Sequence, residues 1–220
     1  MDTGLQRFRH IAIEGAIGVG KTSLARKLAW HLGAELLLEQ AGDNPFLGRF
    51  YEDMPGYAFQ TQIFFLFQRV EQMQQAAQPG MFAGALVSDF LFAKDALFAR
   101  LNLSDDEYRL YTQMYSQAAT QVSEPDLVIW LQAPPATLMQ RVRKRSIAME
   151  QGISADYLQR LRDAYVAFFH SYNGAPVFAV GTEHFNPVER EADFAELLER
   201  LSQFRGRREF FNLQGGRPFA

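Results

Sequence analysis

The stretch from Gly15 to Thr22 reads GAIGVGKT and matches the phosphate-binding pattern G-x-x-x-x-G-K-T. Small residues in such a loop let successive backbone N–H groups turn inward and surround a phosphate chain. The ammonium group of Lys21 would lie on the phosphate that is transferred, and the hydroxyl of Thr22 would be a ligand for Mg²⁺. We therefore expect the polyphosphate of a nucleotide to bind at eight consecutive positions, namely Gly15, Ala16, Ile17, Gly18, Val19, Gly20, Lys21 and Thr22.

The sequence on either side of this loop supplies the context that the motif requires. Residues 10–14 form a short apolar run that suits a buried strand. Leu24, Leu28 and Leu32 follow at helical spacing, and Gly33 stands where a helix commonly ends. The positive end of that helix would face the phosphates. Because strand, loop and helix occur in this order, a plain glycine-rich turn is the less favoured interpretation.

Strand-like and helix-like patterns alternate along the rest of the chain. We expect further strands at 34–38, 85–88, 126–131 and 176–180. We expect further helices at 44–51, 58–78, 92–101, 104–122, 134–145 and 154–172, then a last helix opened by Asn186-Pro187. The basic segment from Arg205 to Ala220 is expected to be irregular. This order predicts an α/β fold of the P-loop NTPase type, with a five-stranded parallel sheet flanked by helices, in one domain that spans residues 1–220.

Two acidic residues stand directly after expected strands, where parallel sheets bind their ligands. Glu39 follows the second strand and could take a proton from a hydroxyl that attacks a phosphate, although a solvated strand end is the plainer interpretation. Asp89 follows the third strand and could hold Mg²⁺ together with Thr22. Asp89 could also be a helix N-cap, and the two roles are compatible.

Two further groups of side chains have both a structural and a chemical interpretation. The run Arg141, Arg143, Lys144 and Arg145 could be a solvated helix end that matches the helix dipole, or a lid, about residues 141–152, that places arginines over the transferring phosphate. Spacing alone leaves these two interpretations open. Phe59 belongs to an aromatic stripe that is usually core, whereas the amide of Gln60 could pair with the edge of a nucleobase.

The bulk composition narrows the class of protein. The 220 residues carry a formal net charge of −3, which makes nucleic acid or an anionic membrane a poor electrostatic partner. The chain has no cysteine, which excludes disulfides and thiolate zinc sites. We find neither a secretory pattern nor an apolar run long enough to cross a bilayer, so we expect a soluble, cytoplasmic protein.

Several phrases together resemble the deoxynucleoside kinase family of P-loop kinases, over nearly the whole chain. The loop phrase IEGAIGVGKT at 13–22 is similar to the opening of that family, although it is not specific to it. The more specific phrases are NPFL at 44–47, FYE at 50–52, FQT at 59–61, LQAP at 131–134 with Arg141, Val142 and Arg145 after it, and EQGI at 150–153 with Tyr157-Leu158 after it.

The resemblance implies ATP as phosphate donor, Mg²⁺, a deoxynucleoside as acceptor and a homodimer. It places Glu39 as the base for the 5′-hydroxyl, and Lys21, Arg141 and Arg145 on the transferring phosphate. The residues implied at the nucleoside are Tyr51 and Glu150 at the 3′-hydroxyl and Phe59 and Gln60 at the base. Asp89 matches the acidic start of the family's third-strand motif, and Asp95 matches an aspartate near the base. Purine deoxynucleosides are weakly favoured, because the chain looks most similar to bacterial deoxyadenosine and deoxyguanosine kinases.

The chain departs from the family pattern at three positions. Phe90 follows Asp89 where the family has an arginine, and Ile147 stands in place of a third lid arginine. Arg143 could substitute for a missing arginine by contacting the donor. Phe67 falls where some relatives have a base-reading arginine, although Arg69 is close by.

Three other functions stay open on the sequence. A nucleoside monophosphate kinase, or another small-molecule kinase, would share the fold but need further cations for the phosphate of its acceptor. A GTP-dependent switch is suggested by D-x-x-G at Asp53–Gly56, but this element follows an aromatic helical stretch and no N-K-x-D motif occurs. The third alternative is a relative of the family without catalytic activity, which the absence of an arginine after Asp89 would allow.

Overall fold

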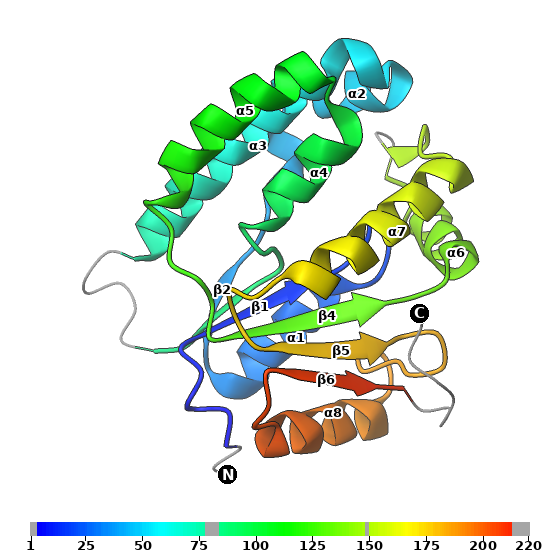
Figure 1. The fold of residues 1–220 in the computed structure, drawn as a ribbon. Helices are drawn as coiled ribbons and strands as arrows, with labels where there is room; N and C mark the ends of the chain where they lie inside the picture. The colour runs from blue at the N-terminus through cyan, green and yellow to red at the C-terminus, as the bar shows by residue number, and fades with distance from the viewer. Residues whose placement is uncertain (1–3, 78–83, 148–149, 213–220) are drawn as a thin grey trace.

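The computed structural model describes residues 4–77, 84–147 and 150–212, which form a six-stranded parallel sheet with helices on both faces (Figure 1). The strands lie in the order β2-β3-β1-β4-β5-β6, and every neighbouring pair is parallel. Their bounds are β1 (His10–Glu14), β2 (Glu35–Leu37), β3 (Leu86–Ser88), β4 (Leu127–Gln132), β5 (Val177–Gly181) and β6 (Arg208–Phe211). The predicted α/β fold is confirmed, with six strands in place of five.

The sixth strand corrects the expectation that the chain is irregular from Arg205 onward. β6 pairs with β5, with Val177 opposite Arg208. The ring of Phe211 packs edge-on against Phe185 at 5.0 Å between centroids. The four residues of β6 include two charged ones, so their sequence gives little indication of a strand. The strand forms because it pairs with backbone N–H and C=O groups that β5 would otherwise leave unpaired. Three of the predicted segments extend beyond the described residues. These parts are the rest of the expected tail (213–220), part of the expected lid (148–149) and position 78 of an expected helix.

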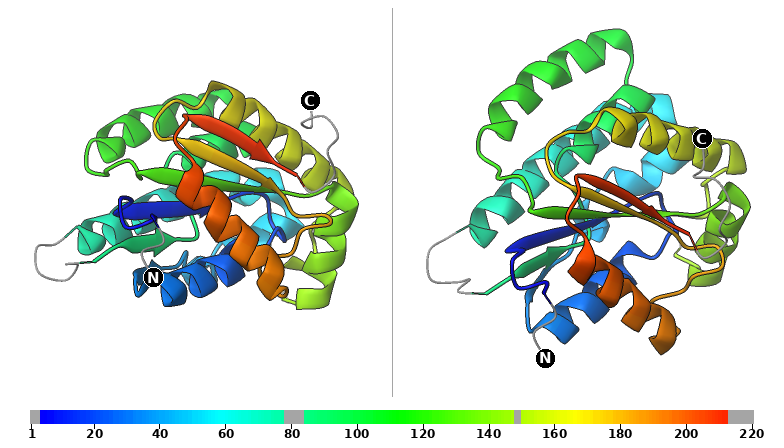
Figure 2. Two further views of the ribbon diagram at one scale, coloured as in Figure 1. Left: turned by 90° about the horizontal axis from the view of Figure 1, so that it is seen from below. Right: turned by 60° about the horizontal axis from the view of Figure 1, so that its bottom comes forward.

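Two layers of helices cover the sheet (Figures 1 and 2). On one side lie α1 (Lys21–Leu32) and α8 (Glu191–Gln203). On the other side lie α3 (Met54–Ala76), α4 (Lys94–Asn102), α5 (Asp105–Ala119) and α7 (Ala155–Ser171). The short helices η1 (Ala41–Asp43) and α2 (Leu47–Glu52) lead into α3, and α6 (Pro135–Arg145) lies beyond the carboxyl ends of the strands. Within the ranges described, no helix has the length and apolar character needed to cross a bilayer.

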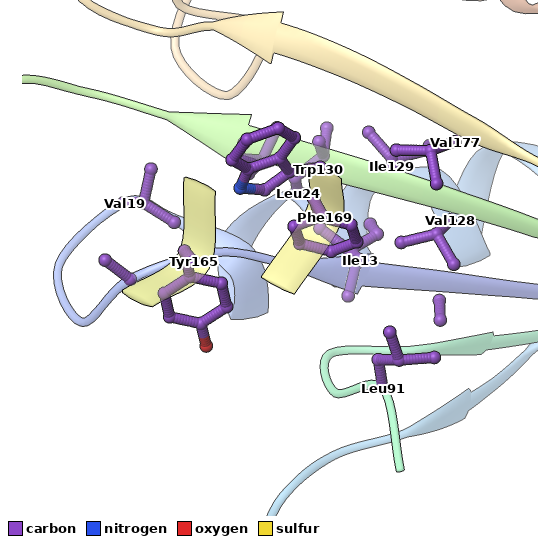
Figure 3. Close-up of a cluster of buried hydrophobic side chains, with 14 of the residues drawn as sticks. Ile13, Val19, Leu24, Leu91, Val128, Ile129, Trp130, Tyr165, Phe169 and Val177 are labelled. Carbon is purple, nitrogen blue, oxygen red and sulfur yellow. The ribbon is translucent and has the colours of Figure 1, made fainter. Parts of the chain in front are cut away.

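The core holds the central strands rigidly on both faces. β4 reads LVIWLQ, and its first five residues are buried, as expected for a strand covered by helices on both sides. The indole of Trp130 stacks on Phe169 of α7 at 4.5 Å, close to Ile13 of β1 (Figure 3). Leu24 of α1 belongs to the same cluster (Figure 3). The loop that follows β1 therefore begins from a fixed point.

Two helices begin at places other than those predicted, and local hydrogen bonds explain both. α3 begins at Met54, because the carboxylate of Asp53 accepts a hydrogen bond from the Gly56 N–H at 3.2 Å. The D-x-x-G phrase is thus a helix cap. α8 begins only at Glu191, and the side chain of Asn186 instead folds a turn by accepting from the backbone N–H groups of the two residues after Pro187.

Candidate active site

The phosphate-binding loop joins β1 to α1 and turns at positions that only glycine tolerates. Gly15 and Gly18 have φ of +148° and +84°. A Cβ at Gly15 would lie 2.3 Å from the Leu131 carbonyl oxygen, and one at Gly18 would lie 2.8 Å from that of Leu138. The ammonium of Lys21 lies over the loop and donates to the Gly15 carbonyl at 2.7 Å. The loop is therefore wedged between β1, the end of β4 and the start of α6.

Glu14 fixes the loop from beneath, a role that the sequence did not indicate. Its side chain is buried, and Oε1 accepts from the Gly15 N–H and from the Tyr165 hydroxyl, both at 2.8 Å. Oε2 accepts from the Leu91 N–H at 2.8 Å. One carboxylate thus ties the loop to α7 and to the segment between β3 and α4.

The two predicted Mg²⁺ ligands lie together. The Thr22 hydroxyl donates to Asp89 Oδ2 at 2.5 Å, and Asp89 Oδ1 accepts from the Glu39 N–H at 2.7 Å. Asp89 is not the cap of α4, because Ala93 holds that position. In the part of the chain that the structure describes, no three His, Cys, Asp or Glu side chains could hold a metal. A hydroxyl and one carboxylate fit Mg²⁺, which typically takes one or two carboxylates together with phosphate oxygens.

Glu39 stands at the carboxyl end of β2 between two cations. Arg69 of α3 donates to Oε1 from Nε at 2.9 Å and from Nη2 at 2.5 Å. Lys94 of α4 lies 3.2 Å from Oε2. Burial by itself would raise the pKa of Glu39, but Lys94, Arg69 and Lys21 outweigh it and hold that pKa well below its usual range. Glu39 is therefore a carboxylate at neutral pH.

Arg69 also joins Glu39 to a second buried acid, Asp95. Its guanidinium pairs with Asp95 Oδ2, while Gln62 Nε2 and the Tyr111 hydroxyl each donate to Oδ1 at 2.6 Å. Burial raises the pKa of Asp95, and the charge of Arg69 opposes that shift. Arg69, the candidate for a base-facing cation, lies inside this cluster, whereas Phe67, which stands where some relatives have a base-reading arginine, is 54% exposed.

The position of Gln60 corrects the expectation that it faces the base. Gln60 is exposed and lines a hollow beside α3 together with half-buried Phe59 and exposed Phe67. Gln62 is buried and contacts Asp95 instead. Two residues along a helix turn by about 200°, so these two glutamines face opposite ways. The seven-residue spacing of Gln62 and Arg69, which places them on one helix face, is the signal that could have found Gln62.

The lid arginines lie beside the loop. Arg141 donates to the Thr182 carbonyl at 2.6 Å and to the Val19 carbonyl at 3.3 Å, and Arg145 pairs with Glu150. Both arginines line a hollow of about 460 Å³ whose floor is the loop, a volume in the range of small-molecule sites. Arg143 is exposed and does not line it, which corrects its expected contact with the donor. Arginines four apart share a helix face, whereas Arg143 lies between them on another face.

Tyr51 and Glu150 lie close enough for the charge of Glu150 to act on the Tyr51 hydroxyl. Burial raises the pKa of the Tyr51 hydroxyl, and Tyr157, Glu150 and Glu39 add to the shift. Gly152 approaches so closely that a Cβ there would lie 2.9 Å from the Tyr51 carbonyl oxygen. Gly152 thus lies against the Tyr51 backbone of α2.

Comparison with known proteins gives one consistent result. A family model described as deoxynucleoside kinase matches residues 11–205. The deoxyguanosine kinase of Bacillus subtilis is 33% identical over 198 residues, which cover 88% of this chain and 96% of that protein. The deoxyadenosine kinase of Dictyostelium discoideum is 34% identical over 187 residues, or 83% and 76% of the two chains. Among solved structures, deoxyadenosine kinase from M. mycoides with bound dATP superposes with a TM-score of 0.75 at 25% identity, over 87% of this chain and 98% of that one.

Proposed function

The chain belongs to the deoxynucleoside kinase family, and on that premise we propose that it transfers the γ-phosphate of ATP to the 5′-hydroxyl of a purine deoxynucleoside. The observation that carries the proposal is the position of Glu39. Its backbone N–H binds Asp89, which in turn binds Thr22 of the phosphate loop. A carboxylate that can accept a proton is thereby fixed beside the residues that would hold the phosphate donor.

The donor would bind in the hollow above the loop. Backbone N–H groups of the loop and the amino end of α1 would hold the polyphosphate, with Lys21 on the transferring phosphate. Arg141 and Arg145, which line the same hollow, would stabilise the charge that develops during transfer. Thr22 and Asp89 would hold Mg²⁺, whose chemistry is to neutralise charge on the phosphates.

The acceptor would lie between Glu39 and the cluster around Asp95. Glu39, ionised at neutral pH, would accept the proton of the 5′-hydroxyl as that oxygen attacks phosphorus. Tyr51, whose hydroxyl is affected by the charges of both Glu150 and Glu39, would hold the 3′-hydroxyl together with Glu150. The base would lie near Phe59 and meet Gln62, Arg69 and Asp95, which offer both donors and acceptors to a purine edge. A purine also agrees with relatives named as deoxyguanosine and deoxyadenosine kinases.

The resemblance and the composition also lead to expectations for the oligomeric state, the location and the partners of the protein. We expect a homodimer, as in the family, located in the cytoplasm. Nucleic acid and membrane are not expected partners, because the formal net charge is −3.

A panel of acceptors tests the proposed function. The four natural deoxynucleosides and their 5′-monophosphates are each incubated with ATP and Mg²⁺, and the products are identified by mass. We expect deoxyguanosine or deoxyadenosine to give its monophosphate at the highest rate. Turnover of monophosphates alone would replace the proposal by a nucleoside monophosphate kinase, and no phosphorylated product at all would indicate a non-catalytic relative.

A further inference from the structure

A buried lysine, Lys94, is not accounted for by the mechanism above. It lies in the first turn of α4 and is only 3% exposed. Its Nζ lies 3.1 and 3.2 Å from the two oxygens of Glu39 and 3.7 Å from Glu14 Oε2. Lysines are almost never buried unless they are paired. The ammonium group of Lys94 thus lies between Glu14, beneath the phosphate loop, and Glu39, on the acceptor side.

We propose that Lys94 is the positioning residue of Glu39 and supplies, from α4, a cation that the chain lacks directly after Asp89. This inference rests on the proposed function, in which Glu39 accepts the proton. The position next to Asp89 holds Phe90, which is buried in the core and carries no charge. Arg143, the other candidate for a replacement cation, is exposed outside the donor hollow.

The location of Lys94 explains how it can replace a residue from another position. Phe90 is buried two residues after the end of β3, and α4 begins four residues after Phe90. Hydrogen bonds from the Lys94 and Asp95 N–H groups to the Leu91 and Phe92 carbonyls close this first turn. The turn returns the lysine side chain to the carboxyl edge of β2, where Glu39 lies.

Two cations from two different helices fix the orientation of the Glu39 carboxylate. Arg69 binds Oε1 only, so it leaves the group free to turn about that contact. Lys94 binds Oε2 as well, and charge-assisted bonds to both oxygens define the plane of the carboxylate. Arg69 is shared with Asp95, and Lys21 donates to the loop, so neither can take over this contact.

A purely structural role is the competing explanation, because Lys94 also lies 3.7 Å from buried Glu14. Removing it would then destabilise the protein and lower activity by an amount unrelated to Glu39. The two explanations differ in whether the effects of replacing Lys94 and Glu39 on kcat depend on each other. If Lys94 acts through Glu39, its loss costs little further activity once Glu39 is already neutral.

The test compares Lys94→Met, Lys94→Arg, Glu39→Gln and the double variant Lys94→Met/Glu39→Gln. Lys27→Met is the matched control, since Lys27 pairs with the exposed Glu191. We expect Lys94→Met to lower kcat about 100-fold while KM for ATP stays within about twofold. Lys94→Arg should recover most of the loss because it restores the charge. In the double variant kcat should fall no more than about threefold below Glu39→Gln.

Two results would overturn the inference. One is a folded Lys94→Met protein with the kcat of the wild type. The other is a double variant whose losses multiply. Should Lys94→Met fail to fold, Lys94→Gln, which also removes the charge but keeps a polar side chain, gives the same comparison with and without Glu39→Gln. Should the wild type phosphorylate no deoxynucleoside, the proposed function fails independently of this inference. Urea unfolding of the same four variants then tests the contact between Lys94 and Glu39. Free energies of unfolding that change additively in the double variant would contradict that contact.

Discussion

Both oxygens of the Glu39 carboxylate are bound by cations, which sets what its replacement should do. Glu39→Gln keeps the size of the side chain but cannot accept a proton. Loss of a general base typically costs about 10²–10⁴ in rate, so we expect kcat to fall at least about 100-fold while the protein folds and binds ATP. Steady-state kinetics of 5′-phosphorylation measures the change.

The matched control for this prediction lies on β2, the strand that leads to Glu39. Glu35 of β2 is exposed and lies four residues before Glu39. Glu35→Gln should leave kcat unchanged. Near-normal turnover by Glu39→Gln would remove Glu39 from the mechanism.

His10, at the start of β1, should make the protein sensitive to acid. Ser88 Oγ donates to the Phe90 carbonyl, so the His10 imidazole must donate from Nε2 to Ser88 at 2.8 Å. Burial lowers the pKa of His10 to about 4, against a weak opposing effect of Asp126. A pKa that is lower in the folded state means that the unfolded chain binds the proton first. Stability should therefore fall as the pH drops from about 6.5 to about 4, by up to about 3 kcal/mol.

Urea unfolding at a series of pH values measures this loss. His10→Gln retains a donor for Ser88 but cannot titrate, so its stability should vary less between pH 7 and pH 4. His170→Gln, at an exposed position of α7, is the control and should follow the wild type. An unchanged profile in His10→Gln would assign the acid sensitivity to other groups.

At the scale of residues, the sequence predicted those site residues that a local motif or the end of a strand marks. Thr22 and Asp89 were found from a loop motif and a strand end, and they do lie 2.5 Å apart. Glu14, Gln62 and Lys94 were not assigned roles, because their partners come from other elements. A buried charge is indistinguishable from a surface charge until the fold supplies its partner.

At the scale of elements, long periodic segments were predictable and short ones were not. The strands at the centre of the sheet and the long helices appear within a few residues of their predicted bounds. β6 was missed because its four residues gain their stability from pairing with β5, a contact about thirty residues away in the chain. The start of α8 was misplaced because an asparagine turn resembles a helix cap in sequence.

β6 offers a direct test, because adjacent phenylalanines face opposite ways. Phe211 is buried against Phe185, whereas Phe210 is 54% exposed. Phe211→Ala should lower the free energy of unfolding by about 3 kcal/mol, since it removes a buried ring and leaves a cavity. Phe210→Ala should change it by no more than about 0.5 kcal/mol. Urea unfolding compares the two, and equal effects would contradict the packing of this strand.

At the scale of the whole molecule, the order of the strands divides the site into two halves. The chain runs to one side of β1 for β2 and β3 and to the other side for β4, β5 and β6. Parallel sheets bind ligands at the carboxyl ends of the strands where the order reverses in this way. The phosphate loop follows the carboxyl end of β1, at this point of reversal (Figure 1). Glu39 and Asp89 come from the β2–β3 side, whereas Arg141 and Thr182 come from the β4–β5 side. The proposed base, Glu39, and the lid arginine Arg141 thus come from opposite halves of the sheet.

The outer face of α3 and α5 is where we expect the proposed homodimer to form. Phe67 and Leu110 are 54% and 50% exposed, large apolar side chains that water would otherwise cover. A groove between the two helices runs from Phe67 to Met114, one helical turn beyond Leu110. A surface of this kind, repeated on a second copy, would pair with itself about a twofold axis.

Phe67→Glu should therefore convert a dimer into a monomer, because two like charges would face each other across a dry interface. Light scattering coupled to gel filtration measures the mass of each species. Trp30→Glu is the control: Trp30 is 85% exposed on α1, in the helix layer on the other side of the sheet, and its replacement should leave the dimer intact. A wild-type protein that elutes as a monomer would refute the dimer. A Phe67→Glu protein that stays dimeric would move the interface away from α3 and α5.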